Sequence, residues 1–213
     1  MVLLTKYEGG SFLMINKKYS AGLVSQSFWF VEFKRVVNLL NHGETEEKIK
    51  SLCLEENLFG AAKEYRAKRI YGYIWNRVKQ LDEGLIKLFC GSDLATQKII
   101  NLICILKIDR LFFEFLYEVY REKAILGFDK IEDTDISTFF NRKEIQNDDI
   151  ASWTDETKKR LRNIYTNYMV DANLLTVVDK EKKITVPILD LSLERYLKES
   201  GDEVLVKALT GGR

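Results

Sequence analysis

The sequence predicts a mainly α-helical protein, in which a helical bundle is followed by a C-terminal winged helix-turn-helix-like module with one β-hairpin. Two observations lead to this prediction. Apolar residues recur at the helical spacing i, i+3, i+4 and i+7 over most of the 213 residues. Near the C-terminus, residues 174–178 and 184–186 are instead rich in β-branched side chains and flank a polar segment, which is typical of a hairpin.

The bundle is expected in residues 1–127 and the module in residues 128–213, because a helix stop at Gly127 is followed by a polar cluster. Residues 1–18 are mixed in character, and we expect a mobile segment there with a flexible point at Gly9-Gly10. The apolar run at the N-terminus is too short for a signal peptide. Helices are predicted over residues 23–40, 45–54, 61–81, 85–89, 93–106 and 111–126.

Local signals define several of these helix ends. Asn41-His42-Gly43 stops the first helix, Thr45 caps the second, and Asp109 caps the last. The most apolar window, residues 99–120, contains charged residues, so it predicts core helices and no membrane span. The cations of the 61–81 helix are spread around its axis, which favours a solvated surface over one binding face; they are Lys63, Arg66, Lys68, Arg69, Arg77 and Lys79.

In the module, a helix capped by Asp133 or Thr134 is predicted to run to residue 145. After a polar break at residues 146–149, a long amphipathic helix starts at Thr154 and ends at Asn173, which tolerates the left-handed conformation. Residues 179–183 form the hairpin turn, and Pro187 ends the second strand. Two short helices, 192–199 and 202–209, complete the chain.

The late helix and the hairpin suggest a site for double-stranded DNA. One face of the helix is apolar, whereas the opposite face is polar and basic. In a winged helix-turn-helix this helix enters the major groove and the hairpin, the wing, contacts phosphates. Residues expected to face the groove are Arg162, Asn163, Thr166 and Asn167. Residues expected to reach phosphates are Lys158, Lys159, Arg160, Lys180, Lys182 and Lys183.

Composition limits the function. The net charge of +1 and the pI near 7.6 lie below the strongly basic balance of a dedicated nucleic-acid binder, so any such surface must be a local patch. Three widely spaced cysteines and one histidine do not form the spacing of a zinc site, and they fit a reduced cytoplasm. With no glycine-rich phosphate loop either, we expect neither an enzyme nor a cofactor.

The chain resembles the BrxA family of BREX bacteriophage-exclusion systems over about residues 17 to 190. The resemblance lies in the order and spacing of Tyr19-Ser20-Ala21, Glu55-Glu56-Asn57-Leu58, Arg121-Glu122-Lys123, and Trp153-Thr154 with Lys159 to Arg162. It implies a cytoplasmic, mostly helical protein that is encoded beside a DNA methyltransferase and a large ATPase. It also implies a role in restricting phage, with double-stranded DNA as ligand.

Two alternatives remain open. The protein could be an assembly adaptor that docks the defence ATPase or methyltransferase, in which case it would expose an apolar patch. It could also bind RNA through its N-terminal helices, since the helical part of the resembled family has been compared with the RNA-binding antitermination protein NusB. That alternative predicts RNA affinity in residues 1–127 alone.

Overall fold

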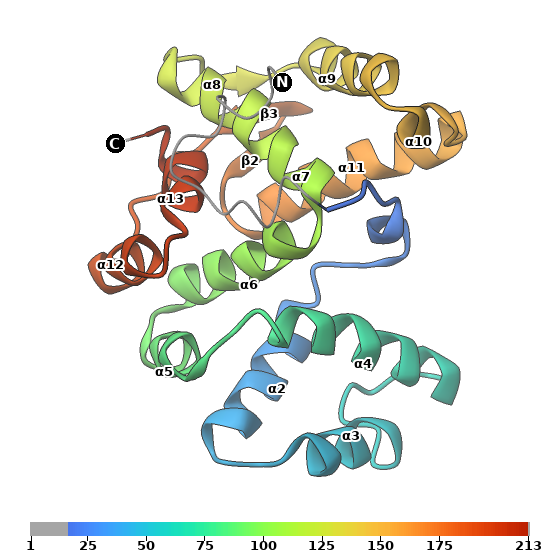
Figure 1. Cartoon of the computed structure of the whole chain (residues 1–213), viewed down its shortest axis with the longest axis vertical. Helices are drawn as coiled ribbons and strands as arrows, with labels where there is room; N and C mark the ends of the chain where they lie inside the picture. Colours follow the sequence, from blue (N-terminus) through green and yellow to red (C-terminus); the bar gives the residue numbers. More distant parts are fainter. Residues whose placement is uncertain (1–16, 213) are drawn as a thin grey trace. The chain divides into compact units, whose positions relative to one another are not determined.

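The computed structural model describes residues 17–212 and confirms a mainly helical protein with a small antiparallel sheet (Figure 1). The expectation of mobility thus lies, for residues 1–16, outside the described residues. The chain forms two compact units, one of residues 26–108 and one that joins residues 17–25 to residues 109–212. The domain boundary after Gly127 does not coincide with these unit limits, and it stays a prediction.

The unit of residues 26–108 is entirely helical in its regular structure. Its helices are α2 (Phe30–Asn41), α3 (Glu46–Leu54), α4 (Glu64–Val78), α5 (Glu83–Gly91) and α6 (Leu94–Ile108). Thr45 caps α3 as predicted, because its side chain accepts a hydrogen bond from the backbone N–H of Lys48. Residues 99–106 are all buried, which confirms the prediction of a core helix in this window.

The helix predicted over residues 23–40 is interrupted. A short 3₁₀ helix, η1 (Gly22–Ser25), is separated from α2 by an irregular segment, and Trp29 has a left-handed φ of 43°. Buried Arg77 donates to the carbonyls of Ser27 and Phe28, and the amide of Asn101 donates to that of Phe28 at 3.0 Å. These side chains hold the carbonyls that a continuous helix would use, so tertiary contacts override the local periodicity.

Within the second unit, the helix predicted over residues 111–126 has three parts. A π-helical turn, η2 (Leu116–Tyr120), lies between α7 (Arg110–Phe115) and α8 (Arg121–Ile125). Asp109 caps this stretch by accepting from the N–H of Phe112 at 2.8 Å, as predicted. Gly127 follows with a φ of +75°, which suits glycine at a helix end.

The rest of this unit contains three strands and five helices among the described residues. In chain order they are β1 (Lys130–Ile131), α9 (Asp133–Gln146), α10 (Asp148–Ala151), α11 (Asp155–Asp171), β2 (Leu175–Val178), β3 (Glu181–Ile184), α12 (Leu191–Glu199) and α13 (Glu203–Thr210). The sheet order is β1-β3-β2, and all pairs are antiparallel. The sequence analysis did not predict β1 and α10, which have two and four residues, because such short elements show no periodicity.

Two details of the prediction are corrected. The turn between β2 and β3 consists of Asp179 and Lys180 alone, both with positive φ as in a two-residue type I′ hairpin, so residues 181–183 belong to β3. The cap of α9 is Glu132, which forms a capping box with Asp135, rather than Asp133 or Thr134.

Packing follows the predicted amphipathic pattern of α11. Its buried residues include Leu161, Tyr165, Tyr168 and Met169, and the ring of Tyr165 stacks on Phe112 with 4.6 Å between centroids. Thr154 caps the helix and Asn173 ends it with a φ of 61°, both as predicted.

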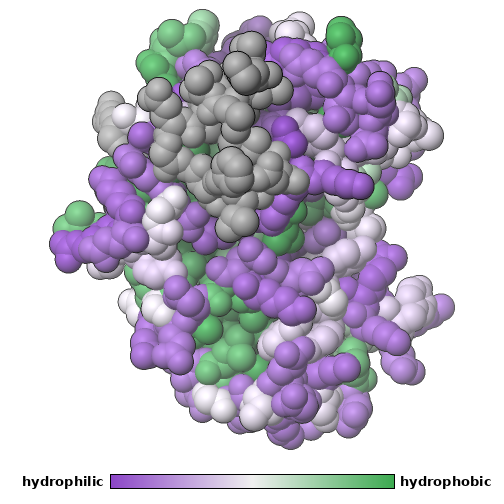
Figure 2. Space-filling view, viewed as in Figure 1, coloured by the Kyte–Doolittle hydropathy of each residue, from purple (hydrophilic) through white to green (hydrophobic). Residues whose placement is uncertain are grey.

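Hydrophilic residues cover most of the face shown in Figure 2, and hydrophobic residues emerge there in separate patches. No helix in residues 17–212 has both the length and the hydrophobicity needed to cross a lipid bilayer.

Candidate nucleic-acid interface

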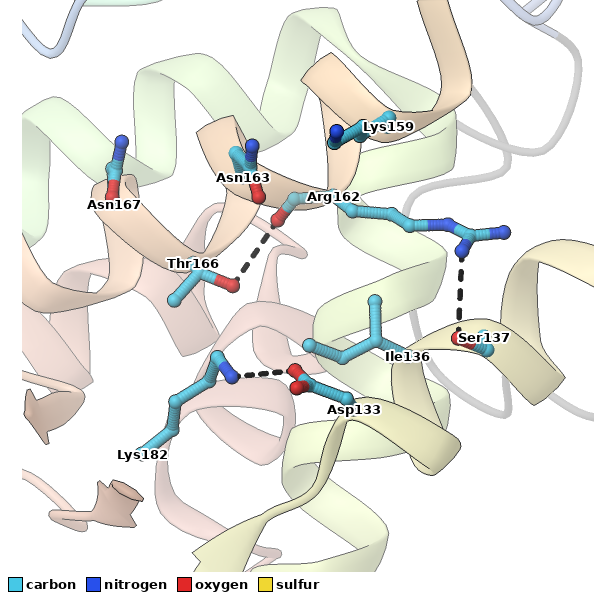
Figure 3. A pocket seen from close by; sticks show the side chains of 9 residues that line it. All are labelled: Asp133, Ile136, Ser137, Lys159, Arg162, Asn163, Thr166, Asn167 and Lys182. Carbon is cyan, nitrogen blue, oxygen red and sulfur yellow. Dashed lines mark hydrogen bonds and ion pairs between the residues drawn. The ribbon is translucent and has the colours of Figure 1, made fainter. Parts of the chain in front are cut away.

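The exposed side of α11 forms one wall of a groove of about 510 Å³, hereafter the α11 groove (Figure 3). Residues at i, i+3, i+4, i+7 and i+8 along α11 line it, because this spacing keeps side chains on one face of a helix. The first turns of α9 form the opposite wall, and one residue comes from β3. The lining residues are Lys159, Arg162, Asn163, Thr166 and Asn167 of α11, Asp133, Ile136 and Ser137 of α9, and Lys182 of β3.

The arginine of the groove is held in place by neutral contacts. The guanidinium of Arg162 lies over the ring of Phe140, 5.2 Å from its centroid, and donates to Ser137 Oγ at 3.4 Å. Among the residues that the structure describes, no carboxylate forms an ion pair with Arg162 or Lys159. Both cations are therefore available to an anionic ligand.

Lys182 has a partner in the groove. Its ammonium group donates to Asp133 Oδ1 at 2.7 Å, and the aspartate side chain is 89% exposed (Figure 3). Counting the side chains that line the α11 groove, the three cations Lys159, Arg162 and Lys182 outnumber this one carboxylate. The groove thus carries a positive excess although the whole chain is nearly neutral.

Lys158 does not lie with the other predicted residues. It is 6% exposed, and its ammonium group lies 2.8 Å from Glu144 and 3.5 Å from Asp155. The hydrogen bond to Glu144 raises the pKa of Lys158. The spacing contained a signal of this placement, because Lys158 precedes the buried Leu161 by three residues and Tyr165 by seven.

The remaining predicted cations lie outside the groove lining. Arg160 is exposed and pairs with Glu156 at 3.0 Å, whereas Lys180 lies in the exposed hairpin turn. Lys183 follows Lys182 in β3, and successive residues of a strand point to opposite faces. The five-residue turn expected from the sequence did not distinguish these two lysines.

The groove also contains three residues that sequence reasoning did not assign to a site. Asp133 was expected as a helix cap and Ile136 as a core residue, and Ile136 is indeed buried. Ser137 had no expected role. All three come from α9, so their placement depends on how α9 packs beside α11, and only the position of Asp133 just after β1 could have indicated it.

A buried charge cluster supports α9 from the core side. Lys143 donates to Glu114 and, at 3.0 Å, to Glu118, and all three side chains are 3% exposed. Arg110 bonds Glu114 at 2.8 Å, and Tyr19 donates to the same carboxylate at 2.9 Å. The cluster ties α9 to α7 and η2, which fixes the wall of the groove that Ser137 belongs to.

Comparison with known proteins identifies related sequences and a related fold. The BrxA family profile matches residues 17–201. A protein of Bacillus cereus (strain H3081.97) named "BREX protein BrxA" is 34% identical over 193 residues, which cover 91% of this chain and 96% of that protein. The crystal structure of an uncharacterized protein from Magnetospirillum magneticum superposes with a TM-score of 0.77 at 17% identity, over 92% of this chain and all of that one.

Proposed function

Because this chain belongs to the BrxA family, we propose that it acts in a BREX phage-defence system as a cytoplasmic, non-enzymatic accessory protein that binds double-stranded DNA. The observation that supports DNA binding is the alignment of Lys159, Arg162, Asn163, Asn167 and Lys182 along one groove. Phosphate contacts by lysine and arginine dominate the affinity of most DNA-binding proteins, and amides can read base edges.

The order of elements supports the same proposal. A helical stretch, a short strand, helices α9 to α11 and a hairpin follow one another, and β1 pairs with β3. We interpret this arrangement as a winged helix-turn-helix in which α11 is the recognition helix and β2–β3 is the wing. The connection between α9 and α11 includes α10, so it is longer than the three or four residues of the tight motif.

The side chains divide into two roles under this proposal. Asn163 and Asn167 are exposed amides, and an amide can donate to N7 and accept from N6 of adenine in the major groove. Thr166 hydrogen-bonds the carbonyl of Arg162 at 3.1 Å and contributes mainly its methyl group. Phosphate contacts are assigned to Lys159, Arg160, Arg162, Lys180, Lys182 and Lys183, whereas the ion-paired Lys158 is left out.

A mobility-shift series with a duplex of random sequence tests the proposal. About four phosphate contacts predict a fall in affinity of roughly 100-fold between about 50 and 200 mM salt. Lys159→Gln and Arg162→Gln should each weaken binding and reduce the salt dependence. Lys198→Gln is the control, because Lys198 is an exposed, ion-paired helix lysine outside the groove. Equal effects of the three substitutions would refute a DNA site at the α11 groove.

An assembly adaptor is the second candidate, and an apolar groove of about 630 Å³ favours it. Residues at the end of α8, after β3 and in α13 line this groove. Ile188 is fully exposed there, and Ile125 is 48% exposed. Large exposed apolar side chains are typical of protein-docking surfaces. If Ile188→Asp abolishes capture of the BREX methyltransferase or ATPase after nuclease treatment, while DNA binding persists, the chain also works as an adaptor.

A further inference from the structure

Helix α4, in the unit of residues 26–108, has a polar face that the proposed DNA site does not use. Its buried side packs on the neighbouring helices through Ala67, Ile70, Tyr71, Ile74, Arg77 and Val78. The opposite side is exposed, and we call it the α4 face; it consists of Tyr65, Arg66, Lys68, Arg69, Asn76 and Lys79. At 100° per residue these positions fall within an arc of about 160°.

This arrangement corrects the interpretation that the cations of this helix surround its axis. Arg77, which pointed to such a spread, is 0% exposed and donates to backbone carbonyls of its own unit. Lys63 precedes the helix as its N-cap residue. The other four cations share the exposed side, so α4 has one basic face after all.

The cations of the α4 face are available for a ligand. Within residues 17–212, no carboxylate forms an ion pair with Arg66, Lys68, Arg69 or Lys79. Glu64 is the acidic residue of the first turn, and by helical phase it lies beyond the edge of the arc next to Lys68. Glu46 and Glu47 of α3 act on Tyr71, on the buried side of the helix. Four uncompensated cations along a helix of roughly 22 Å suit an extended polyanion.

An exposed aromatic ring distinguishes the α4 face from a simple cationic surface. The side chain of Tyr65 is 67% exposed, and its position follows the same helical phase as Arg69 and Asn76. Beside this face, Trp29 and Tyr73 stack with 5.7 Å between centroids and 19° between planes, and both are partly exposed. Aromatic rings among cations are the features on which unstacked bases stack while the backbone is neutralised.

We propose that the α4 face binds single-stranded nucleic acid, as a site separate from the α11 groove. A duplex hides the faces of its bases, so it would leave Tyr65 without a stacking partner. A single strand exposes both its bases and its phosphates, and it can use the ring and the four cations together. The geometry does not involve a 2′-hydroxyl, so DNA and RNA strands share this recognition chemistry.

Fluorescence anisotropy of the full chain with labelled oligothymidylate and oligouridylate of about 20 nucleotides tests this site. Arg66→Gln with Arg69→Gln should weaken binding of single strands about tenfold and lower the salt slope by about 1.4. Tyr65→Ala should weaken it about tenfold at every salt concentration, since stacking is not ionic. Binding of duplex DNA should stay unchanged in both variants, which separates this site from the α11 groove.

The control is Lys50→Gln with Lys87→Gln, which removes two exposed lysines from the same unit. All substituted side chains are exposed, so unchanged thermal melting curves will show that the variants are folded. The proposal is overturned if the α4 variants lose no more single-strand affinity than the control. It is also overturned if polyglutamate binds as tightly as the oligonucleotides and Tyr65→Ala leaves both affinities unchanged, because the face would then serve an acidic protein.

Discussion

Lys182 Nζ donates a hydrogen bond to Asp133 Oδ1 at 2.7 Å, which joins β3 to the first turn of α9 inside the α11 groove. The lysine is 19% exposed and the aspartate 89%, so solvent screens the pair and it adds little stability. A phosphate in the groove would have to compete with this carboxylate for the lysine.

Asp133→Asn should therefore raise the affinity for duplex DNA by about two- to fivefold, because it removes a negative charge and frees Lys182. The free energy of unfolding should fall by less than about 1 kcal/mol. Anisotropy titrations at low salt measure the affinity, and urea denaturation measures the stability. A variant that binds duplex DNA more weakly would contradict this account of the groove.

Lys180→Gly should separate stability from DNA binding. Lys180 has a φ of 68°, a conformation that costs a non-glycine residue about 1 kcal/mol, and glycine removes this cost in a type I′ turn. We expect a small rise in the melting temperature together with weaker binding of all duplex sequences, since the lost ammonium group is assigned to a phosphate. If affinity does not change, Lys180 has no such contact.

Lys143→Met should be strongly destabilising. It leaves the carboxylates of Glu114 and Glu118 buried with fewer partners, and breaking such a pair typically costs about 3–5 kcal/mol. Lys198→Met removes an ion pair with the exposed Glu194, and it should cost less than about 1 kcal/mol. Chemical denaturation of both variants checks the difference. Similar losses in the two variants would show that the buried cluster does not hold α9.

Asp109→Asn should make the protein more stable above neutral pH. Burial raises the pKa of Asp109 from its ordinary value of 3.8 to about 7. Between these values the folded state holds a proton that the unfolded state has released, so the contribution of this group to stability falls as pH rises from about 4 to about 7. Asparagine cannot ionise and can still cap α7.

Unfolding free energies of the two proteins across this pH range provide the measurement for Asp109→Asn. We expect the gain to be absent near pH 4 and largest near pH 8, at about a few kcal/mol. A gain that is independent of pH would show that the carboxyl group does not titrate in this range.

Features of the fold with a long periodic signal could be predicted from the sequence. The α11 helix was predicted with its cap at Thr154 and its end at Asn173, because the apolar spacing extends over five turns. The break before Phe30 could not be predicted, since it depends on Arg77, about fifty positions farther along the chain. The two-residue strand β1 owes its existence to pairing with β3 and not to its own sequence.

The candidate site could be predicted on one wall only. Helical phase placed Arg162, Asn163, Thr166 and Asn167 on a shared face, and the structure places them along one groove. The α9 wall depends on tertiary packing, which spacing does not encode. Lys158 shows the opposite case, because its phase with Leu161 signalled burial but its charge suggested exposure.

The π-helical turn at Leu116–Tyr120 also limits how this region can evolve. Hydrogen bonds in such a turn span one residue more than in an α-helix, so the residues after it are rotated by about 100° from the phase of a continuous helix. Losing a single residue there would restore regular geometry but turn α8 and the apolar Ile125 toward a different side. The turn therefore sets the orientation of everything between Arg121 and the start of the sheet, and family members should tolerate substitutions within it more readily than deletions.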